Sequence, residues 1–421
     1  MITREQIHEL AQFEDHGACA LSFYFQPTAP RNKAHKEEAI ATKEVLREAL
    51  RQLENRGTSA SKSECESART DIDRIVRLSQ DLRGNGTHGK AVFACAAQGF
   101  WREYDLPPQL GNTQLFVDRH FHLKPVARLL GAFPSLGVVL LDRHRARMFD
   151  LRLGELTERL DFFHPLPHRG RGDGFAGYDA GHAEHRVADE VRQHFKLVAE
   201  VLKNAVEKHV FEQWILGCQD LHWSQFEPQL HPDVAQRLLG RFSAEVAYVS
   251  RETIRAQAEQ IFAEWQKKRC SEVVRETISQ ARSNGRGVTG LRRVLRSLEL
   301  GEVQTLLIGD RYVAQAVECT GCGHLDAHLV SSCPVCERET REVVDVSEAI
   351  LPWVIRRDVE LFYVKDDPDL DSVGNIAALL RFRSEQSKVR EITDAVGKES
   401  LGRQPGRVGR YRGLASGLGQ I

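Results

Sequence analysis

Hydrophobic and polar positions along the chain fall into three successive patterns of strands and helices. The first pattern begins with a strand-like apolar run at 18–25, followed by charged segments of helical spacing at 34–55 and 63–82. Two further strands, at 90–97 and 100–106, then flank a Gln-Gly turn. Together these elements predict an N-terminal α/β domain over residues 1–130.

The second pattern begins with two apolar strands, 136–142 and 146–153, joined by a charged turn. The stretch 168–181 is rich in glycine and has no apolar periodicity, so we expect a mobile loop there. Apolar residues then recur every three or four positions over 182–210, which predicts a long amphipathic helix. A strand at 211–218 and a long charged helix at 252–283 complete a central domain, predicted to cover 131–270.

The third pattern alternates helices and strands and predicts an α/β/α domain over 271–385. Gly285 should stop the preceding helix, and Thr289 should cap the next one. Strands at 303–309, 359–364 and 376–382, with a helix at 346–357 that can bend at its proline, complete βαβ connections. The fold class is therefore α/β with three domains, each a mixed sheet with helices.

The remaining residues, 386–421, form a basic tail that we expect to be disordered until it is bound. Its final stretch, 402–421, contains no acidic residue. The arginines of that stretch are Arg403, Arg407, Arg410 and Arg412.

Composition fits this picture and excludes several classes of protein. A chain of 421 residues is too long for one core, and 41% hydrophobic with 28% charged residues is typical of globular proteins. The formal charge of −1 identifies no partner. No secretory signal or long apolar run is present, so a cytoplasmic, non-membrane protein is expected. Phosphate-binding, dinucleotide-binding and nucleophile-elbow motifs are also missing from the sequence.

Four of the nine cysteines lie in one cluster, written CTGCGHLDAHLVSSCPVC. Two Cys-x2-Cys knuckles can present four thiolates to one tetrahedral zinc ion, which closes the coordination sphere and gives a structural rather than a catalytic site. His324 and His328, between the knuckles, are alternative ligands. The other five cysteines are scattered singly and are expected to be reduced thiols. The predicted ligands are Cys319, Cys322, Cys333 and Cys336.

The glycine-rich stretch HRGRGDGFAGYDAGHAEHR combines glycine with arginine and histidine. Glycine allows close backbone approach, and arginine and histidine suit phosphate contact, so an RNA-facing role is chemically sensible. A solvated surface loop is the simpler alternative, and a second metal site at Asp179, His182 and His185 is a remote one. The candidate RNA-binding residues are His168, Arg169, Arg171, Gly172, Asp173, Gly174, His182, His185 and Arg186.

Three passages together resemble the archaeo-eukaryotic peptide-chain release factor and Pelota superfamily, in particular its bacterial branch. They are LGVVLLDRHRARMFDLRLGEL, HRGRGDGFAGYDAGHAEHRVADEVRQHFKLVAEVL, and GVTGLRRVLRSLELGEVQTLLIGDRY with the knuckles and IAALLRFR after it. The resemblance implies a central domain with a loop before a long helix. It also implies a ribosomal-protein-like last domain that can carry a zinc insertion.

The chain departs from this family at the catalytic tripeptide. Release factors place Gly-Gly-Gln in the central loop, whereas this chain reads Gly172-Asp173-Gly174-Phe175 there. The resemblance to Pelota and Balon-like members, which lack the tripeptide, therefore implies a ribosomal A-site binder that acts in rescue, stalling or hibernation. No catalytic residue is assigned.

Two other functions remain open at this point. One is a divergent peptidyl-tRNA hydrolase that uses His182 or Asp173 to orient water, and the other is an RNA-binding stress protein that does not act on the ribosome. The implied partner is rRNA at the A site, with a translational GTPase as a further candidate. A monomer with no DNA partner is expected.

Overall fold

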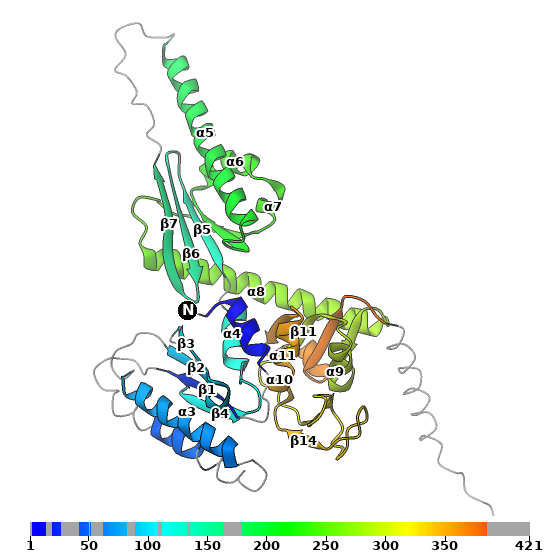
Figure 1. Ribbon diagram of the computed structural model, residues 1–421. Coiled ribbons are helices and arrows are strands. Elements are labelled where there is room, and N and C mark those ends of the chain that lie inside the picture. Colours follow the sequence, from blue (N-terminus) through cyan, green and yellow to red (C-terminus); the bar gives the residue numbers. More distant parts are fainter. Residues whose placement is uncertain are drawn as a thin grey trace, which may run out of the picture.

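The protein is built on three main sheets that lie in separate units (Figure 1). The computed structural model describes residues 2–13, 19–26, 42–49, 51, 62–81, 89–107, 112–132, 135–163 and 179–384. We call the described residues up to 132 the N-terminal unit, 135–250 the central unit and 283–384 the C-terminal unit. The helix α8, Arg251–Arg282, joins the last two.

The N-terminal unit is an antiparallel sheet in the order β3-β2-β1-β4. Every residue of β1 is buried because helices cover both faces of the sheet, as its unbroken apolar run predicts. Leu46 and Ile72 pack on one face, and Leu10 and Val126 pack on the other. The elements are α1 (Arg4–Ala11), β1 (Ala20–Phe25), a helical segment at 42–49, α3 (Lys62–Asp81), β2 (Gly89–Cys95), β3 (Phe100–Leu106), β4 (Gln114–Asp118) and α4 (Lys124–Ala132).

The central unit is a mixed sheet in the order β7-β6-β5-β8-β9. Phe195 and Leu202 of α5 pack on one face, and Ile254 and Phe262 of α8 pack on the other. Strand β5 passes so close to Phe211 that a Cβ at Gly137 would lie 2.7 Å from its ring. The elements are β5 (Leu136–Leu141), β6 (Arg145–Arg152), β7 (Glu155–Phe163), α5 (Asp179–Glu207), β8 (Gln213–Gly217), α6 (Asp220–Phe226), α7 (Pro232–Ala235) and β9 (Leu238–Phe242).

The C-terminal unit is a mixed sheet in the order β10-β16-β11-β15, between two layers of helices. Strands β11 and β15 are parallel, and α10 and α11 lie in the connection between them, so the predicted βαβ construction is confirmed. A small sheet, β13-β12-β14, is inserted in the same connection. The elements are β10 (Gly287–Thr289), α9 (Leu291–Glu299), β11 (Val303–Gly309), β12 (Ala316–Cys319), β13 (Leu325–Asp326), β14 (Thr340–Val343), α10 (Val346–Ala349), α11 (Leu351–Arg356), β15 (Glu360–Val364), α12 (Pro368–Ser372) and β16 (Ile376–Leu380).

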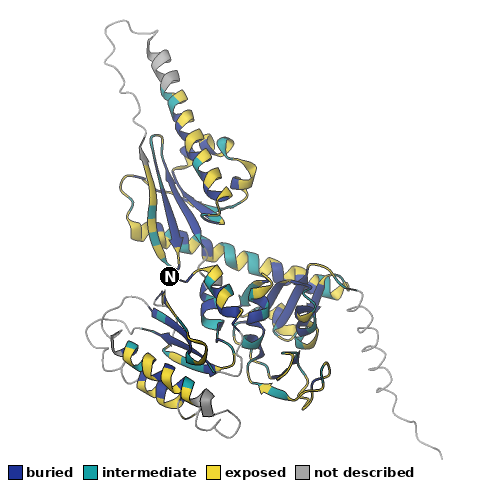
Figure 2. Cartoon of the chain, viewed as in Figure 1, coloured by how far each residue is buried: buried dark blue, intermediate teal, exposed yellow. Residues whose placement is uncertain are grey.

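Helix α8 is continuous and contributes to two cores, as the buried surfaces in Figure 2 illustrate. Ser250 caps its start by accepting a hydrogen bond from the N–H of Thr253 at 3.1 Å. The first half packs in the central unit, whereas Val274 and Ile278 pack under the C-terminal sheet. The domain boundary predicted near residue 270 stays a prediction, because one unbroken helix serves both units.

Most predicted elements are confirmed, and the differences concern turns and caps. The α/β class is confirmed, although the N-terminal sheet is antiparallel rather than mixed. The predicted Thr289 cap is wrong, because Thr289 ends β10 and Gly290, which has no side chain, occupies the cap position. Asn284 rather than Gly285 adopts the left-handed conformation after α8, with φ 52°.

Outside the cluster, Cys95 and Cys218 are buried, and Cys218 and Cys270 are free thiols. In the described part of the chain, no helix is both long and apolar enough to cross a membrane. The tail at 386–421 lies outside the described residues.

A polar joint fixes the N-terminal unit against the C-terminal unit. The carboxyl group of Glu348, on α10, accepts hydrogen bonds from the backbone N–H groups of Leu123 and Lys124, at 2.5 and 3.2 Å. It therefore caps the start of α4 from a distant part of the sequence. Lys124 Nζ lies 2.6 Å from both Asp345 Oδ2 and Ser347 Oγ.

Burial keeps the side chain of Glu348 neutral, although the N–H groups of Leu123 and Lys124 and the charge of Lys124 favour its charged form. Burial raises the pKa of Glu348 to about 8, and burial together with nearby Lys124 lowers the pKa of His122 to about 4. The contact of 3.3 Å between His122 Nε2 and Glu348 is therefore one between neutral groups near pH 7. The carboxylate of Asp345 also opposes a charge on Glu348, and Asp345 pairs with Lys124. Further ion pairs, Arg128 with Asp310 and Arg341 with Asp118, cross between the same two units.

Glu348→Gln should remove a pH dependence of this joint. The folded pKa of Glu348 lies above its ordinary value of 4.5, so its contribution to the joint is full below that pH and is lost as the pH rises toward about 8. His122 acts in the opposite direction, losing its contribution as the pH falls from 6.5 toward about 4. When the pH rises from 6.5 to 8.5, the joint between the N-terminal and C-terminal units of the wild type should therefore open roughly ten times more often.

The measurement is the amide-exchange protection factor of residues 123–129, corrected for the intrinsic effect of pH. The amide introduced by E348Q would mimic the neutral carboxyl group, so this variant should hold its protection across the same range. An equal loss of protection in both proteins would contradict the assignment of the dependence to Glu348.

Candidate functional site: the central arm and the cysteine cluster

The glycine-rich stretch connects two well-packed elements at one end of the central unit. Strand β7 ends at Phe163 and helix α5 begins at Asp179, at the end of the unit that points away from the other two (Figure 1). We call residues 164–186 the arm. His168 to Gly174 lie outside the described residues. His182, His185 and Arg186 fall on the first turns of α5, but their side chains lie outside the described set, so the RNA-binding assignment stays a prediction.

The β6–β7 ribbon that carries one end of the arm is held by paired charges. Arg145 contacts both carboxylate oxygens of Asp161, at 2.9 and 2.7 Å, and Arg147 contacts both of Glu158, at 2.8 and 3.2 Å. These paired hydrogen bonds lower the pKa values of Asp161 and Glu158. The ribbon thus offers a defined geometry up to the start of the arm.

The other end of the arm rests on α5, whose buried face fixes its direction. Val191, Phe195 and Val198 pack into the core of the central unit, and Phe195 meets Phe226 edge-to-face at 5.7 Å between ring centroids. Below them, Trp214 Nε1 donates to the carbonyl of Val234 at 2.7 Å. Both ends of the arm are therefore attached to rigid elements.

Strand β7 and the ion pairs that it makes are not among the elements predicted from the sequence. The signal is present in residues 155–163, ELTERLDFF, where Leu156, Leu160 and Phe162 alternate with polar residues. The acids in this alternation meet the arginines of β6 across the ribbon, Asp161 opposite Arg147 and Glu158 opposite Phe149 in register. The bulge between Met148 and Phe149 shifts the pairing, and this is not visible in the sequence.

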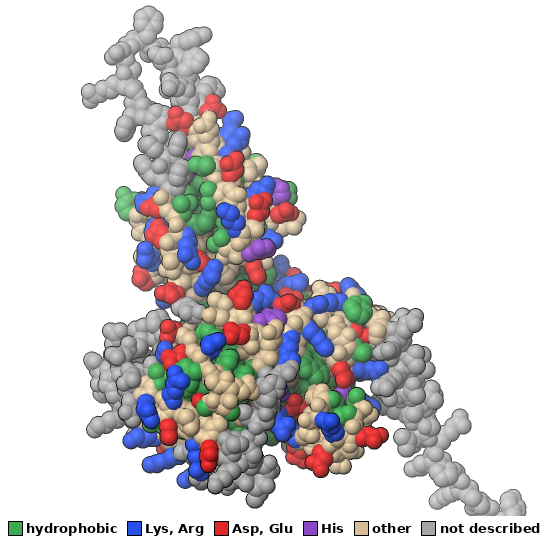
Figure 3. Space-filling view, in the orientation of Figure 1, with side chains coloured by type: hydrophobic (Ala, Val, Ile, Leu, Met, Phe, Trp, Pro, Cys, Tyr) green, Lys and Arg blue, Asp and Glu red, His purple; other side chains and the backbone are tan. Residues whose placement is uncertain are grey.

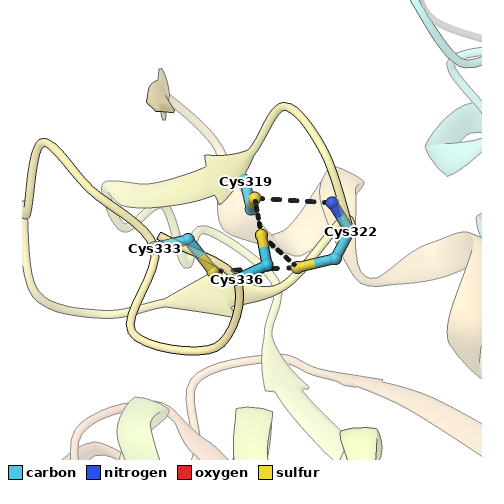
Figure 4. A group of neighbouring side chains, drawn as sticks. All are labelled: Cys319, Cys322, Cys333 and Cys336. Carbon is cyan, nitrogen blue, oxygen red and sulfur yellow. Dashed lines mark hydrogen bonds between the residues drawn. The ribbon is translucent and has the colours of Figure 1, made fainter. Parts of the chain in front are cut away.

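The structure brings together the four cysteines of the predicted metal site (Figure 4). The sulfur of Cys336 lies 3.3 Å from that of Cys319 and 3.5 Å from that of Cys322, which lies 3.7 Å from that of Cys333. Four sulfurs around a tetrahedral ion at about 2.3 Å would be separated by about 3.8 Å. The four residues therefore fit one tetrahedral metal ion.

The two knuckles share one backbone geometry. Gly323 follows the second cysteine of the first knuckle with φ 70°, and Glu337 follows that of the second with φ 61°. Each donates its N–H to the carbonyl of the first cysteine of its knuckle, at 3.1 and 2.9 Å. A non-glycine residue in this conformation costs on the order of 1 kcal/mol, so the second knuckle accepts a strain that the first avoids.

Backbone N–H groups donate hydrogen bonds that stabilise the thiolate form of the cluster's first cysteine. Cys319 Sγ accepts from the N–H groups of Cys322 and Gly321, and these bonds lower the pKa of its thiol to about 6. The pKa of Cys322 rises to about 12 in spite of the N–H of His324, because burial and the neighbouring sulfurs oppose a second charge. A divalent cation is the group that would let all four become thiolates.

The alternative histidine ligands are directed elsewhere. His324 Nδ1 lies 2.8 Å from Glu299 Oε1 on α9, and His328 Nδ1 lies 3.3 Å from Asp326. In the described part of the chain, the cluster that can hold a metal ion consists of the four cysteines. His324 instead fastens the insertion to the body of the C-terminal unit.

The central unit is similar to a known protein family. The model of a family described as bacterial archaeo-eukaryotic release factor family 10 matches residues 122–263. This region therefore matches the bacterial branch of the archaeo-eukaryotic release-factor superfamily. The superfamily resemblance seen in the sequence is therefore confirmed.

The release-factor likeness extends beyond the central unit. Peptide chain release factor subunit 1 of Pyrococcus abyssi is 25% identical over 310 residues, 66% of this chain and 74% of the relative. Among solved structures, ribosome-bound archaeal Pelota is 17% identical, with 71% and 78% of the two chains covered and a TM-score of 0.38. An archaeal translation termination factor is 16% identical, with 90% and 99% covered and a TM-score of 0.24.

Metal analysis tests the cysteine cluster directly. The purified full-length protein should contain about one equivalent of a divalent metal ion per chain, because four thiolates close one tetrahedral site. Cys333→Ser should lose that metal, whereas His328→Ala should retain it. Chelation should speed proteolysis within 316–343 and leave the two other units intact, because the insertion has little apolar core of its own.

A chain that contains no metal when purified without chelator would contradict the assignment. So would equal metal content in the Cys333→Ser and wild-type proteins.

Proposed function

We propose that the protein is a ribosome-associated translation factor that occupies the A site and directs its arm toward the peptidyl-transferase region. The observation that carries the proposal is the release-factor family match over 122–263, in a chain whose arm reads Gly172-Asp173-Gly174 where the family resemblance implies Gly-Gly-Gln. In the family, that tripeptide orients water at the peptidyl-tRNA ester. The proposed action is therefore occupation of the site in rescue, stalling or hibernation, without hydrolysis.

Features of the described residues support this role. The β6–β7 ribbon and α5 would carry the arm as a projection of fixed direction. The joint at Glu348 holds the N-terminal and C-terminal units together, so the arm projects from a defined body. A factor that contacts separate ribosomal sites at once requires fixed distances between its units and its arm.

We further propose that the metal of the cysteine cluster is zinc. Thiolates are soft ligands, and a closed tetrahedral set of four is typical of structural zinc. Its place in the proposed function is to stabilise the insertion at 316–343, and no chemical step is assigned to it. The protein would act in the cytoplasm as a monomer, and a translational GTPase is a candidate for its delivery.

Sedimentation with ribosomes tests the first proposal. The wild-type protein should co-sediment at low salt and dissociate as salt rises, because phosphate contacts release counterions. R169Q/R171Q should weaken binding by about tenfold and reduce the slope of log affinity against log salt by about two. Arg255→Gln is the matched control, because Arg255 on α8 pairs with Glu259 and is assigned no RNA contact.

If the wild-type protein stays at the top of the gradient at low salt, the ribosomal proposal is wrong. Binding to free RNA under the same conditions would then favour the RNA-binding stress protein.

Peptide release from ribosome-bound peptidyl-tRNA separates the proposed factor from a divergent hydrolase. We expect no release above the buffer rate, because the tripeptide that orients water is missing. Release by the wild type that is lost in His182→Ala or Asp173→Asn would establish the hydrolase instead.

A further inference from the structure

The cysteine-bearing insertion has an exposed surface that is both acidic and apolar. Five of the ten large hydrophobic side chains that are exposed in the described residues lie within 313–344. They concentrate on a segment that supplies a small part of the described chain, so their exposure is not the usual scatter over a surface. The five are Val313, Leu329, Val330, Val335 and Val344.

Three carboxylates lie beside these apolar residues. Glu337, Glu339 and Glu342 are exposed, and none makes an ion pair within the part of the chain that the structure describes. Two arginines lie in the same segment: Arg341 is held by Glu318 and Asp118, whereas Arg338 is exposed between Glu337 and Glu339, so the carboxylates exceed the exposed basic charge. Four thiolates around one divalent ion would add further negative charge. In the space-filling view, acidic, basic and hydrophobic side chains lie side by side on the lower right lobe, which carries the insertion (Figure 3).

An acidic surface of this kind repels nucleic-acid phosphates and attracts a basic, partly apolar segment. The sequence contains such a segment at its end. In 402–421, RQPGRVGRYRGLASGLGQ with flanking Gly and Ile, four arginines are interleaved with valine, tyrosine and leucine, and no acid is present. The charges and the apolar residues of the two segments are complementary.

The tail also starts beside the insertion. The N–H of Ser384, the last described residue, donates to Glu302 Oε1 at 2.8 Å. Glu299, three positions earlier, holds His324 of the insertion at 2.8 Å. The intervening segment 385–401 can span at most about 60 Å, which is ample for a return to the insertion. Covalent attachment also gives a local concentration on the order of millimolar.

We propose that residues 402–421 dock on the surface of the insertion formed by Leu329, Val330, Val335, Glu337, Glu339 and Glu342. The arginines pair with the carboxylates, and the apolar residues of the tail cover the exposed valines and leucine. This contact keeps the tail on its own C-terminal unit until a stronger polyanion competes for the arginines. It does not depend on the proposed function at the ribosome.

Trypsin cleavage of the full-length protein tests the contact, because the tail arginines are the cleavage sites. At 50 mM salt, cleavage after Arg403, Arg407, Arg410 and Arg412 should be about fivefold slower in the wild type than in E337Q/E339Q/E342Q. The difference should disappear at 300 mM salt, where screening is stronger. The control is E252Q/E272Q/E276Q, which removes three exposed carboxylates of α8 and should cleave like the wild type.

A second measurement locates the contact and shows whether a change in metal binding could account for the result. Amide exchange within 328–344 should be faster in R403Q/R407Q/R410Q/R412Q than in the wild type, at equal metal content. The proposal is overturned if the tail is cleaved equally fast in the wild type and the insertion variant at 50 mM salt. It is also overturned if the α8 control releases the tail to the same extent, since the tail would then dock elsewhere.

Discussion

The contact between the buried carboxyl group of Glu348 and the start of α4 lies at the centre of the joint between two of the three units. Its carboxyl group closes the N-terminus of α4 in place of a local cap, so the helix and the unit that contains it are completed only when the C-terminal unit is in place. Leu351, on the same side, joins the apolar cluster of the N-terminal unit, and Arg356 donates to the carbonyl of Ala11. Polar and apolar contacts thus reinforce one another at the joint.

The central unit is attached to this joined body in a different way. Helix α8 runs out of its core and into the core of the C-terminal unit without a break, and Leu153 of the β6–β7 turn packs against the N-terminal cluster. Ion pairs from Arg145 and Arg147 then extend the order along the ribbon toward the arm. Buried or paired side chains thus extend from the N-terminal cluster at Leu153 along the ribbon as far as Asp161.

Sequence patterns predicted the local elements well and the contacts between units poorly. The apolar stripe of α5 and the run of β1 are local signals, and both gave correct elements. The cysteine spacing was sufficient to predict that the four cysteines lie together, because two Cys-x2-Cys knuckles can supply all the ligands of one tetrahedral metal ion. Glu348, by contrast, lies in an ordinary helical turn, and its partner at Leu123 is a backbone N–H that any residue would provide. Contacts of that kind leave no residue-type pattern in one sequence.

We propose that the joined units present a non-hydrolytic arm at the peptidyl-transferase region of the ribosome. A cryo-EM map of the full-length protein on ribosomes measures this most directly. We expect the first turns of α5 to lie beside the acceptor end of the P-site tRNA, with the contact between Glu348 and Leu123 intact. A bound protein whose α5 points away from that region, or whose N-terminal and C-terminal units are separated, would contradict it.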